Sequence, residues 1–190
     1  MRSELHPLLA ARWSPRALVP TATIPDDALR SILEAARWAP SWGNTQPARY
    51  LVGRRDDETY RAIFATLSRG NKSWAGGAAA LLLACAVTVN EKGDIPLAEY
   101  GVGLATENLV LQTVAEGYVA HQMGGFDRDA AREAFALPLE VQPLVVVAIG
   151  VLGSPELLPE ERRERETRPR QRIPLEQLVF TGTWGEAADL

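Results

Sequence analysis

The chain has 190 residues, a length that fits one domain with a sizeable hydrophobic core. Its contents of 46% hydrophobic and 23% charged residues are ordinary for a soluble globular protein. The formal net charge of -4 argues against a general nucleic-acid-binding protein, which would present a basic face.

Other classes are excluded by what the sequence lacks. No apolar segment reaches the roughly 18 residues that a membrane span needs, and the N-terminus has no apolar core of a signal peptide. We therefore expect no membrane association and a cytoplasmic location. Cys85 lies alone in an apolar stretch and is interpreted as a buried small hydrophobe. His6 and His121 lack metal-ligand spacing, so no metal site is predicted.

The first half of the chain mixes helical and strand patterns. A short helix is expected over Leu5–Ala11. Pro25 and two acidic residues mark a helix start, and apolar residues spaced by three and four predict an amphipathic helix over Asp26–Trp38. The following segments are predicted as a strand over Tyr50–Gly53, a helix over Asp57–Leu67, a turn over Arg69–Lys72 and a doubly buried strand over Ala79–Val89.

The second half begins with a long helix from Pro96 to Glu116, which is apolar on most sides and is therefore expected to be central. Gly117 ends it. A strand over Tyr118–Met123, a helix over Arg128–Phe135 capped by Asp127, and a strand over Leu144–Val151 follow. The remaining tail, residues 153–190, is charged and rich in proline before it turns apolar at Leu175–Phe180. It either wraps its own domain or reaches across a partner.

Two stretches carry candidate chemistry. Residues 12–16, Arg-Trp-Ser-Pro-Arg, place two guanidinium groups and a hydroxyl where they could converge on a phosphate, although two solvated arginines near a turn would look the same. Residues 39–50 form a loop that cannot be regular, because Pro40 and Pro47 lack the N–H and Gly43 permits positive φ. Its hydrogen-bonding side chains are Ser41, Asn44, Thr45 and Gln46.

The order Pro-Ser-x-x-Asn-x-Gln-Pro in this loop, after an N-terminal Arg-x-Ser-x-Arg, resembles the nitroreductase family. The resemblance implies that the N-terminal motif binds FMN, with its first arginine and serine nearer the isoalloxazine and ribityl end. It also implies that the loop contacts a flavin bound mainly by the other subunit. The residues so assigned are Arg12, Trp13, Ser14 and Arg16 in the motif, and Pro40, Ser41, Trp42 and Asn44 in the loop.

Three further stretches in the right order support the resemblance. Asn71 stands where the family often has an asparagine at the pyrimidine edge of the flavin. Residues 122–127, Gln-Met-Gly-Gly-Phe-Asp, are similar to a family turn whose backbone amides face the flavin N5, which assigns Gln122, Met123, Gly124 and Gly125 to the site. Arg170 and Arg172 resemble the C-terminal basic pair that closes over the FMN phosphate.

The chain departs from the family pattern at three positions. Trp42 stands where a small serine is common, and Ala48 replaces the tryptophan usual after Gln-Pro. Trp74 occupies the place of a lysine that stabilises the reduced flavin in many members, and Lys72 is out of register with it. The indole of Trp42 could pack at a subunit interface, or it could overhang the isoalloxazine and limit the size of the acceptor.

The resemblance implies an α+β fold, with a central, mostly antiparallel mixed sheet flanked by helices and a C-terminal tail that reaches the partner subunit. It implies a homodimer in which FMN passes hydride from NADH or NADPH to a nitroaromatic or quinone by a ping-pong route, without a catalytic side chain. Two alternatives stay open: a related flavin dehydrogenase without the usual nicotinamide use, and a non-catalytic flavin-sequestering protein. A dinucleotide fold and a hydrolase site are not supported, because their motifs lack the required context.

Overall fold

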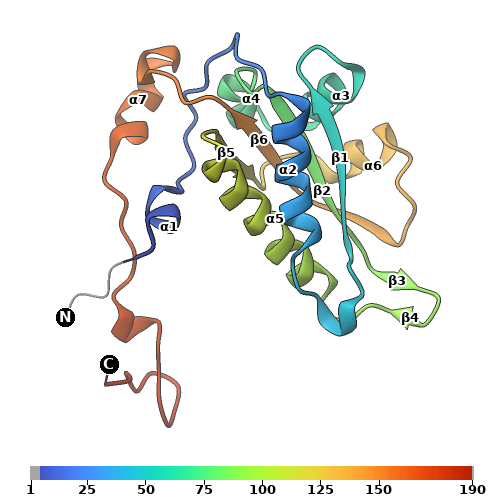
Figure 1. Cartoon of the computed structure of the whole chain (residues 1–190), viewed down its shortest axis with the longest axis vertical. Coiled ribbons are helices and arrows are strands. Elements are labelled where there is room, and N and C mark those ends of the chain that lie inside the picture. Colours follow the sequence, from blue (N-terminus) through green and yellow to red (C-terminus); the bar gives the residue numbers. More distant parts are fainter. Residues whose placement is uncertain (1–4, 190) are drawn as a thin grey trace.

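The computed structural model describes residues 5–189 and is built on one antiparallel sheet of four strands (Figure 1). The strands lie in the order β1–β2–β6–β5, and each neighbouring pair is antiparallel. Their bounds are Ala48–Arg54 for β1, Ala80–Val87 for β2, Val119–Met123 for β5 and Val141–Gly150 for β6. The expected α+β fold is confirmed.

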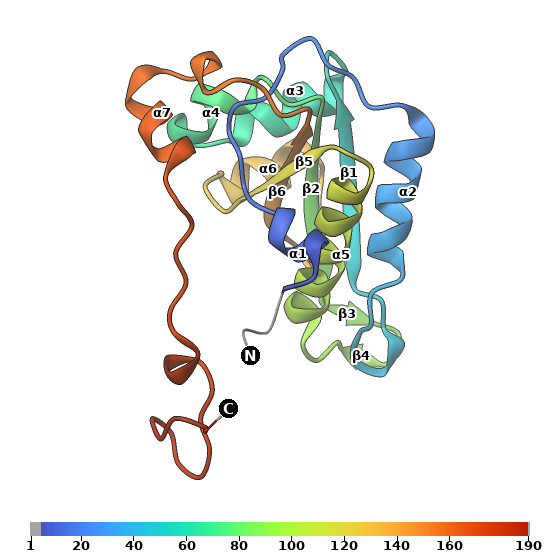
Figure 2. The ribbon, with the colours of Figure 1, turned by 60° about the vertical axis from the view of Figure 1, so that its left-hand side comes forward.

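Helices cover both faces of the sheet (Figure 2). One face packs against α2 and α5, and the other packs against α3, α4 and α6. The helices are α1 (Pro7–Ala11), α2 (Asp26–Arg37), α3 (Glu58–Thr66), α4 (Arg69–Ala75), α5 (Ala98–Ala115), α6 (Arg128–Ala134) and α7 (Glu160–Thr167). Short 3₁₀ turns cover Trp42–Asn44, Pro155–Leu157 and Leu175–Gln177. None of the helices within residues 5–189 is long and apolar enough to cross a membrane.

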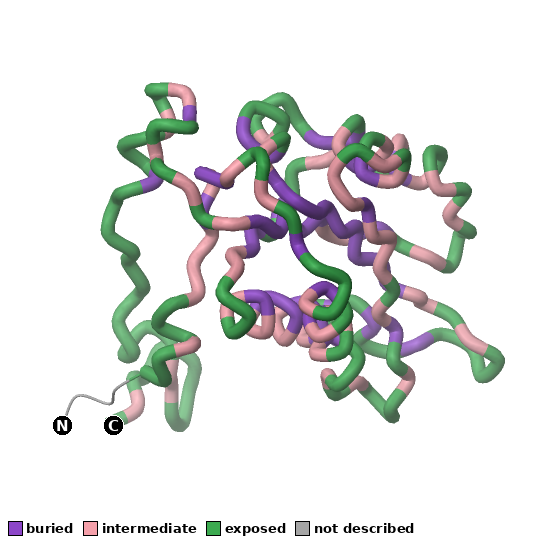
Figure 3. The backbone as a smooth tube through the Cα atoms, turned by 45° about the horizontal axis from the view of Figure 1, so that its top comes forward, coloured by how far each residue is buried: buried purple, intermediate pink, exposed green. Residues whose placement is uncertain are grey.

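Strand β2 lies at the centre of the core, where Figure 3 shows the buried stretches gathered. Successive side chains of a strand point to opposite faces. Accordingly, Leu81 and Leu83 join the cluster under α3, α4 and α6, whereas Leu82 joins the cluster under α2 and α5. All three are at most 1% exposed. The prediction of a strand buried on both faces is confirmed.

Strand β6 begins before the predicted start at Leu144, because a β-bulge accommodates Pro143. The register with β2 shifts between Ala84 and Cys85, which pair with Val145 and Pro143. Proline cannot donate to the ladder and is tolerated at such bulges. The strand therefore continues through a residue that the sequence pattern treats as a break.

The predicted turn over Arg69–Lys72 is wrong, because these residues form the start of α4. Ser68 caps that helix, and its Oγ accepts a hydrogen bond from the Asn71 backbone N–H at 3.4 Å. The Gly-Asn pair inside the segment resembles a turn, and the serine cap outweighs it. A small hairpin, β3 (Val89–Asn90) with β4 (Gly93–Asp94), and helix α7 were also not predicted.

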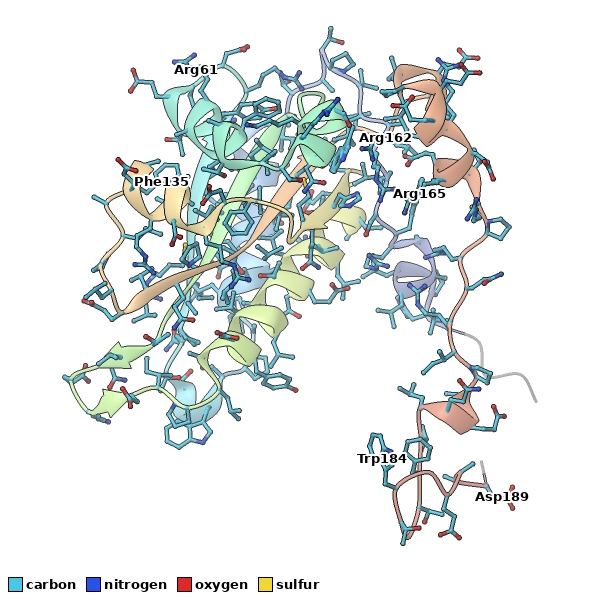
Figure 4. The ribbon with its side chains drawn as sticks, turned by 180° about the vertical axis from the view of Figure 1, so that it is seen from behind. Arg61, Phe135, Arg162, Arg165, Trp184 and Asp189 are labelled. Atoms are coloured by element: carbon cyan, nitrogen blue, oxygen red, sulfur yellow. The ribbon has the colours of Figure 1, made fainter. Side chains whose placement is uncertain are left out.

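The N-terminal segment, residues 12–19, runs beside the start of the tail. The Val19 N–H donates to the Val151 carbonyl at 2.9 Å, and the Gly153 N–H donates to the Ala17 carbonyl at 2.8 Å. Further on, the tail leaves the domain, and Figure 4 shows Trp184 and Asp189 far from the sheet. The early tail thus packs on its own domain, whereas Trp184 is 91% exposed.

The side chain of His121, on β5, holds the N-terminal segment by a hydrogen bond to its backbone. Its Nδ1 lies 2.9 Å from the Pro15 carbonyl oxygen, and since a carbonyl only accepts, Nδ1 carries the proton. The imidazole packs against the Trp74 ring with centroids 4.5 Å apart. Burial lowers the pKa of His121 below its usual range, and the Pro15 carbonyl opposes this shift.

We predict that Gly53→Ala destabilises the protein by about 1–3 kcal/mol, the usual cost of an overpacked core. A Cβ at Gly53 would lie 2.3 Å from the backbone nitrogen of Tyr60, and backbone atoms cannot move aside as a side chain can. Gly76→Ala is the matched control, since its Cβ would make only ordinary contacts with the Phe64 ring at 3.8 Å. Equal midpoints for both variants in chemical denaturation would contradict this packing.

We also predict a specific pH dependence for His121. Because its folded-state pKa is lowered, the unfolded chain binds the proton more readily, so stability is lost as pH falls below about 6.5, the usual histidine value. His121→Asn, which keeps a donor near Pro15, should flatten the fall in unfolding free energy between about pH 7 and about pH 5. If the unfolding free energy falls equally with pH in the wild type and in His121→Asn, protonation of His121 is not the cause of the fall.

Candidate functional site

The N-terminal segment brings Arg12 and Ser14 next to the exposed side of α5 and β5. The Arg12 Nη1 lies 3.4 Å from Ser14 Oγ, and its Nε lies 3.8 Å from Glu107 Oε1. The other oxygen of Glu107 accepts a hydrogen bond from Gln122 Nε2 at 3.1 Å. Glu107 therefore connects the predicted site residues of the N-terminal segment to the predicted site residue of β5.

Arg170 of the tail joins the same place. Its Nη1 donates to the Arg12 carbonyl at 2.6 Å, and its Nη2 donates to the Ala10 carbonyl at 2.5 Å. Arg172 is exposed and donates to the carbonyl of its neighbour Gln171. The structure therefore brings Arg170, the first arginine of the C-terminal basic pair, into contact with the N-terminal segment.

The turn between β5 and α6 lies against α4. The Asn71 amide donates to the Gly125 carbonyl at 2.9 Å, and the Ser68 backbone N–H donates to the same oxygen at 2.9 Å. A Cβ on Gly125 would lie 3.0 Å from both Asn71 Nδ2 and Ser68 Oγ, so a larger residue here would require these two side chains to shift. Gly124 is exposed, with open space where a Cβ would stand.

These residues form one group around the C-terminal end of β5, which we call the cradle: Arg12, Ser14, Asn71, Gln122, Gly124, Gly125 and Arg170. Met123 lies between two of them, but its side chain is 2% exposed and belongs to the core under α3, α4 and α6. Only its backbone can face the cradle. Trp13, on the same segment as Arg12, is half-buried.

Three nearby residues point elsewhere. Lys72 Nζ donates to the Ala65 carbonyl at 2.7 Å, at the end of α3. Trp74 is 6% exposed, and its Nε1 has no hydrogen-bond partner among the described residues. The Arg16 guanidinium lies 3.8 Å from Glu166 Oε2, and burial lowers its pKa. A buried tryptophan therefore stands where many family members have a lysine. The Arg16 guanidinium is held by Glu166, an acidic residue of α7.

The loop after α2 is ordered by its own hydrogen bonds. Ser41 Oγ accepts from the Gln46 N–H at 2.9 Å, while Gly43, Asn44 and Gln46 adopt positive φ. The loop packs on α5, where a Cβ on Gly101 would lie 2.9 Å from Pro47 Cγ and 3.6 Å from Ser41 Cβ. The expectation that residues 39–50 cannot be regular is confirmed in their first half, and β1 begins at Ala48.

The loop borders two cavities. One of about 300 Å³ lies between α2, β1 and α5 and includes Pro40 and Ser41 in its lining. The other, of about 560 Å³, lies between the loop and the β3–β4 hairpin and includes Trp42 and Asn44. Trp42 is 54% exposed. Within residues 5–189, no hydrogen bond or ion pair joins the loop to the cradle, and neither of these two cavities is lined by a cradle residue.

Sequence reasoning missed three contributors to the site region. Glu107 is one of several polar residues in a largely apolar helix, and only its place beside Gln122 and Arg12 gives it a role. Glu166 is one acid in a dense charged run, which offers no signal to separate it from its neighbours. For His121, the sequence raised only the question of metal binding and gave no sign of its contact with Pro15. Among the described residues, no group of three or more His, Cys, Asp and Glu could hold a metal ion.

Comparisons with known proteins identify the family that this chain matches. The model of the nitroreductase family matches residues 9–69 and 57–151. A 15.4 kDa protein of Mycolicibacterium smegmatis, from the ask 5′ region and described as uncharacterised, is 40% identical over 145 residues, which is 72% of this chain and 97% of the relative. A protein of Archaeoglobus fulgidus, with the provisional name NADH dehydrogenase/NAD(P)H nitroreductase, is 29% identical over 131 residues, 67% of this chain and 74% of that protein.

A solved structure, described as the oxidoreductase containing FMN, superimposes with a TM-score of 0.90 at 33% sequence identity. The superposition covers 97% of this chain and 94% of that one, so it includes the N-terminal segment, the sheet and the tail. The family model and these relatives agree over most of the chain. The chain therefore belongs to the nitroreductase family and is an oxidoreductase of that family.

Proposed function

We propose that the cradle binds FMN and that the protein is an FMN-dependent NAD(P)H oxidoreductase acting in the cytoplasm. The observation that carries this proposal is the meeting of Arg12, Ser14 and Arg170, which Glu107 links to Gln122 just before the Gly124–Gly125 turn. Guanidinium and hydroxyl donors suit a phosphate dianion, and an open glycine turn suits a flat ring. The similar structure described as an oxidoreductase containing FMN supports the same ligand.

Each part of the cradle has a distinct role in this proposal. Arg12, Ser14 and Arg170, together with the exposed Arg172, would hold the phosphate and ribityl end. Asn71 is positioned by its hydrogen bond to Gly125, and its amide oxygen can still accept from the edge of the flavin. Arg16 is the last residue of the Arg-x-Ser-x-Arg motif, and we assign it to the flavin as well because it belongs to that motif.

The chemistry that bound FMN supplies is hydride transfer from NADH or NADPH to an electron-poor acceptor such as a nitroaromatic or quinone, in a ping-pong sequence. The protein then has to bind and orient the cofactor and limit access of water. None of these tasks requires a nucleophile or a general base, so we assign no catalytic side chain. Trp42, exposed beside a cavity of about 560 Å³, is placed to restrict what can enter.

We further propose that the functional unit is a homodimer. The loop residues Pro40, Ser41, Trp42 and Asn44 lie apart from the cradle of their own chain, so they would serve the partner's cradle. Large apolar side chains are exposed on α1, the loop, the start of α5 and the tail, and they include Leu9, Trp38, Trp42, Leu97, Tyr100, Leu175, Leu178 and Trp184. Exposed apolar surface of this kind marks an interface. The tail beyond Arg172 would reach across that partner.

The purified protein is expected to be yellow, to contain FMN rather than FAD, and to run as a dimer. The proposed phosphate-binding donors lead to the expectation of FMN, and the exposed apolar surfaces lead to the expectation of a dimer. Absorbance of the protein and of the released flavin identifies the cofactor, and light scattering gives the mass. A colourless monomer that FMN cannot reconstitute would contradict both halves.

Replacing Arg170 and Arg172 together by alanine should weaken FMN binding by roughly a hundredfold or more, because hydrogen bonds to charged groups contribute about 1.5–3 kcal/mol each. Binding of riboflavin, which lacks the phosphate, should barely change. Arg168→Ala is the matched control, since this exposed arginine pairs with Glu164 of its own helix. If FMN and riboflavin weaken equally, the two arginines stabilise the tail rather than bind the phosphate.

A further inference from the structure

Helix α7 is tied to the N-terminal segment by one buried carboxylate, that of Glu166. Its side chain is 2% exposed, and its Oε1 accepts hydrogen bonds from two consecutive backbone N–H groups, those of Arg16 at 2.6 Å and Ala17 at 2.8 Å. Hydrogen bonds to an ionised acceptor are roughly twice as strong as neutral ones. The carboxylate therefore fixes the direction of the backbone where the Arg-x-Ser-x-Arg motif ends.

The surroundings of Glu166 are cationic. Its Oε2 lies 3.8 Å from the Arg16 guanidinium and has no hydrogen-bond partner among the described residues. Arg162 and Arg165 extend from α7 on this side of the molecule (Figure 4), and both lower the pKa of Arg16. A buried carboxylate is tolerated beside such charges, because they offset part of its desolvation cost.

The same stretch of tail touches the N-terminal segment at a second point. Beyond α7, Arg170 donates to the carbonyls of Arg12 and Ala10. Glu166 thus holds residues 16–17 by their N–H groups, and Arg170 holds residues 10–12 by their carbonyls. Of the cradle's donors, Arg12 lies at one of these two attachments and Ser14 lies between them.

We propose that Glu166 is a positioning residue for the cofactor, and this inference rests on the proposed function of the cradle. Glu166 would not contact FMN. By holding the amides of Arg16 and Ala17, it keeps the backbone that carries Ser14 and Arg12 in the geometry that binds FMN. Binding then costs less conformational entropy than it would from a loose segment.

The experiment titrates FMN, followed by its fluorescence, into apoprotein of the wild type, Glu166→Ala, Glu166→Gln and the control Glu161→Ala. Glu161 is an exposed acid on the same helix, so its loss changes the charge of α7 equally. The alanine variant should bind FMN about tenfold more weakly or worse, and the glutamine variant should stay within about threefold of the wild type, because its amide oxygen still accepts from both N–H groups.

Amide hydrogen exchange of the same folded apoproteins gives a readout that does not depend on flavin. The N–H groups of Arg16 and Ala17 should lose protection in Glu166→Ala and keep it in Glu166→Gln. The inference is overturned if Glu166→Ala binds FMN as tightly as the wild type or more tightly, which loss of a negative charge alone would produce. It is also overturned if the glutamine variant binds as weakly as the alanine variant.

These outcomes separate the inference from the function on which it rests. Wild-type protein that binds FMN with no effect of Glu166→Ala overturns only the positioning role. Wild-type apoprotein that takes up no FMN overturns the proposed function, and the positioning role falls with it.

Discussion

Both faces of β2 are covered by helices, and the rest of the molecule is arranged around this constraint. Leu81 and Leu83 face one helical layer and Leu82 faces the other, so the middle of the sheet has no side open to water. Polar ligand-binding groups are costly to bury there unless they are paired. They are accordingly found at the end of β5, in the loop before β1, and on the two chain ends that pass beside the sheet.

The chain ends depend on each other to form the cradle. The N-terminal segment is anchored in the core by Ala17 and Leu18, and it is also held by the His121 ring, by backbone pairing with the start of the tail, and by Glu166 and Arg170. The donors Arg12 and Ser14 are therefore positioned by elements far away in the sequence. If the cradle binds FMN as proposed, this arrangement couples cofactor binding to the position of the tail, whose later apolar residues are exposed in a single chain.

Local patterns in the sequence were sufficient for most of the fold. The apolar periodicity of α2 and the continuous apolar run of β2 both follow from which side chains are buried, so they can be read directly from the order of residues. Helix α4 was missed because its Ser68 cap competes with a turn-like Gly-Asn pair, and α7 was missed because an almost fully charged helix has no apolar stripe. The motifs predict which residues bind FMN, but Glu107 and Glu166 act through contacts with residues at least half of the chain away, and no local pattern encodes those contacts.

In the proposed dimer, one cofactor site combines the cradle of one chain with the loop of the other. Hybrid dimers test it most directly, made from Arg12→Ala/Arg170→Ala chains and Trp42→Ala/Asn44→Gly chains, the glycine preserving the positive φ of Asn44. Each parent homodimer should bind FMN weakly at both sites. In the hybrid, one site carries both defects and the other carries none, so half of the sites should bind FMN with wild-type affinity. Two sites with the affinities of the two parents would show that each site lies within one chain and would contradict the account.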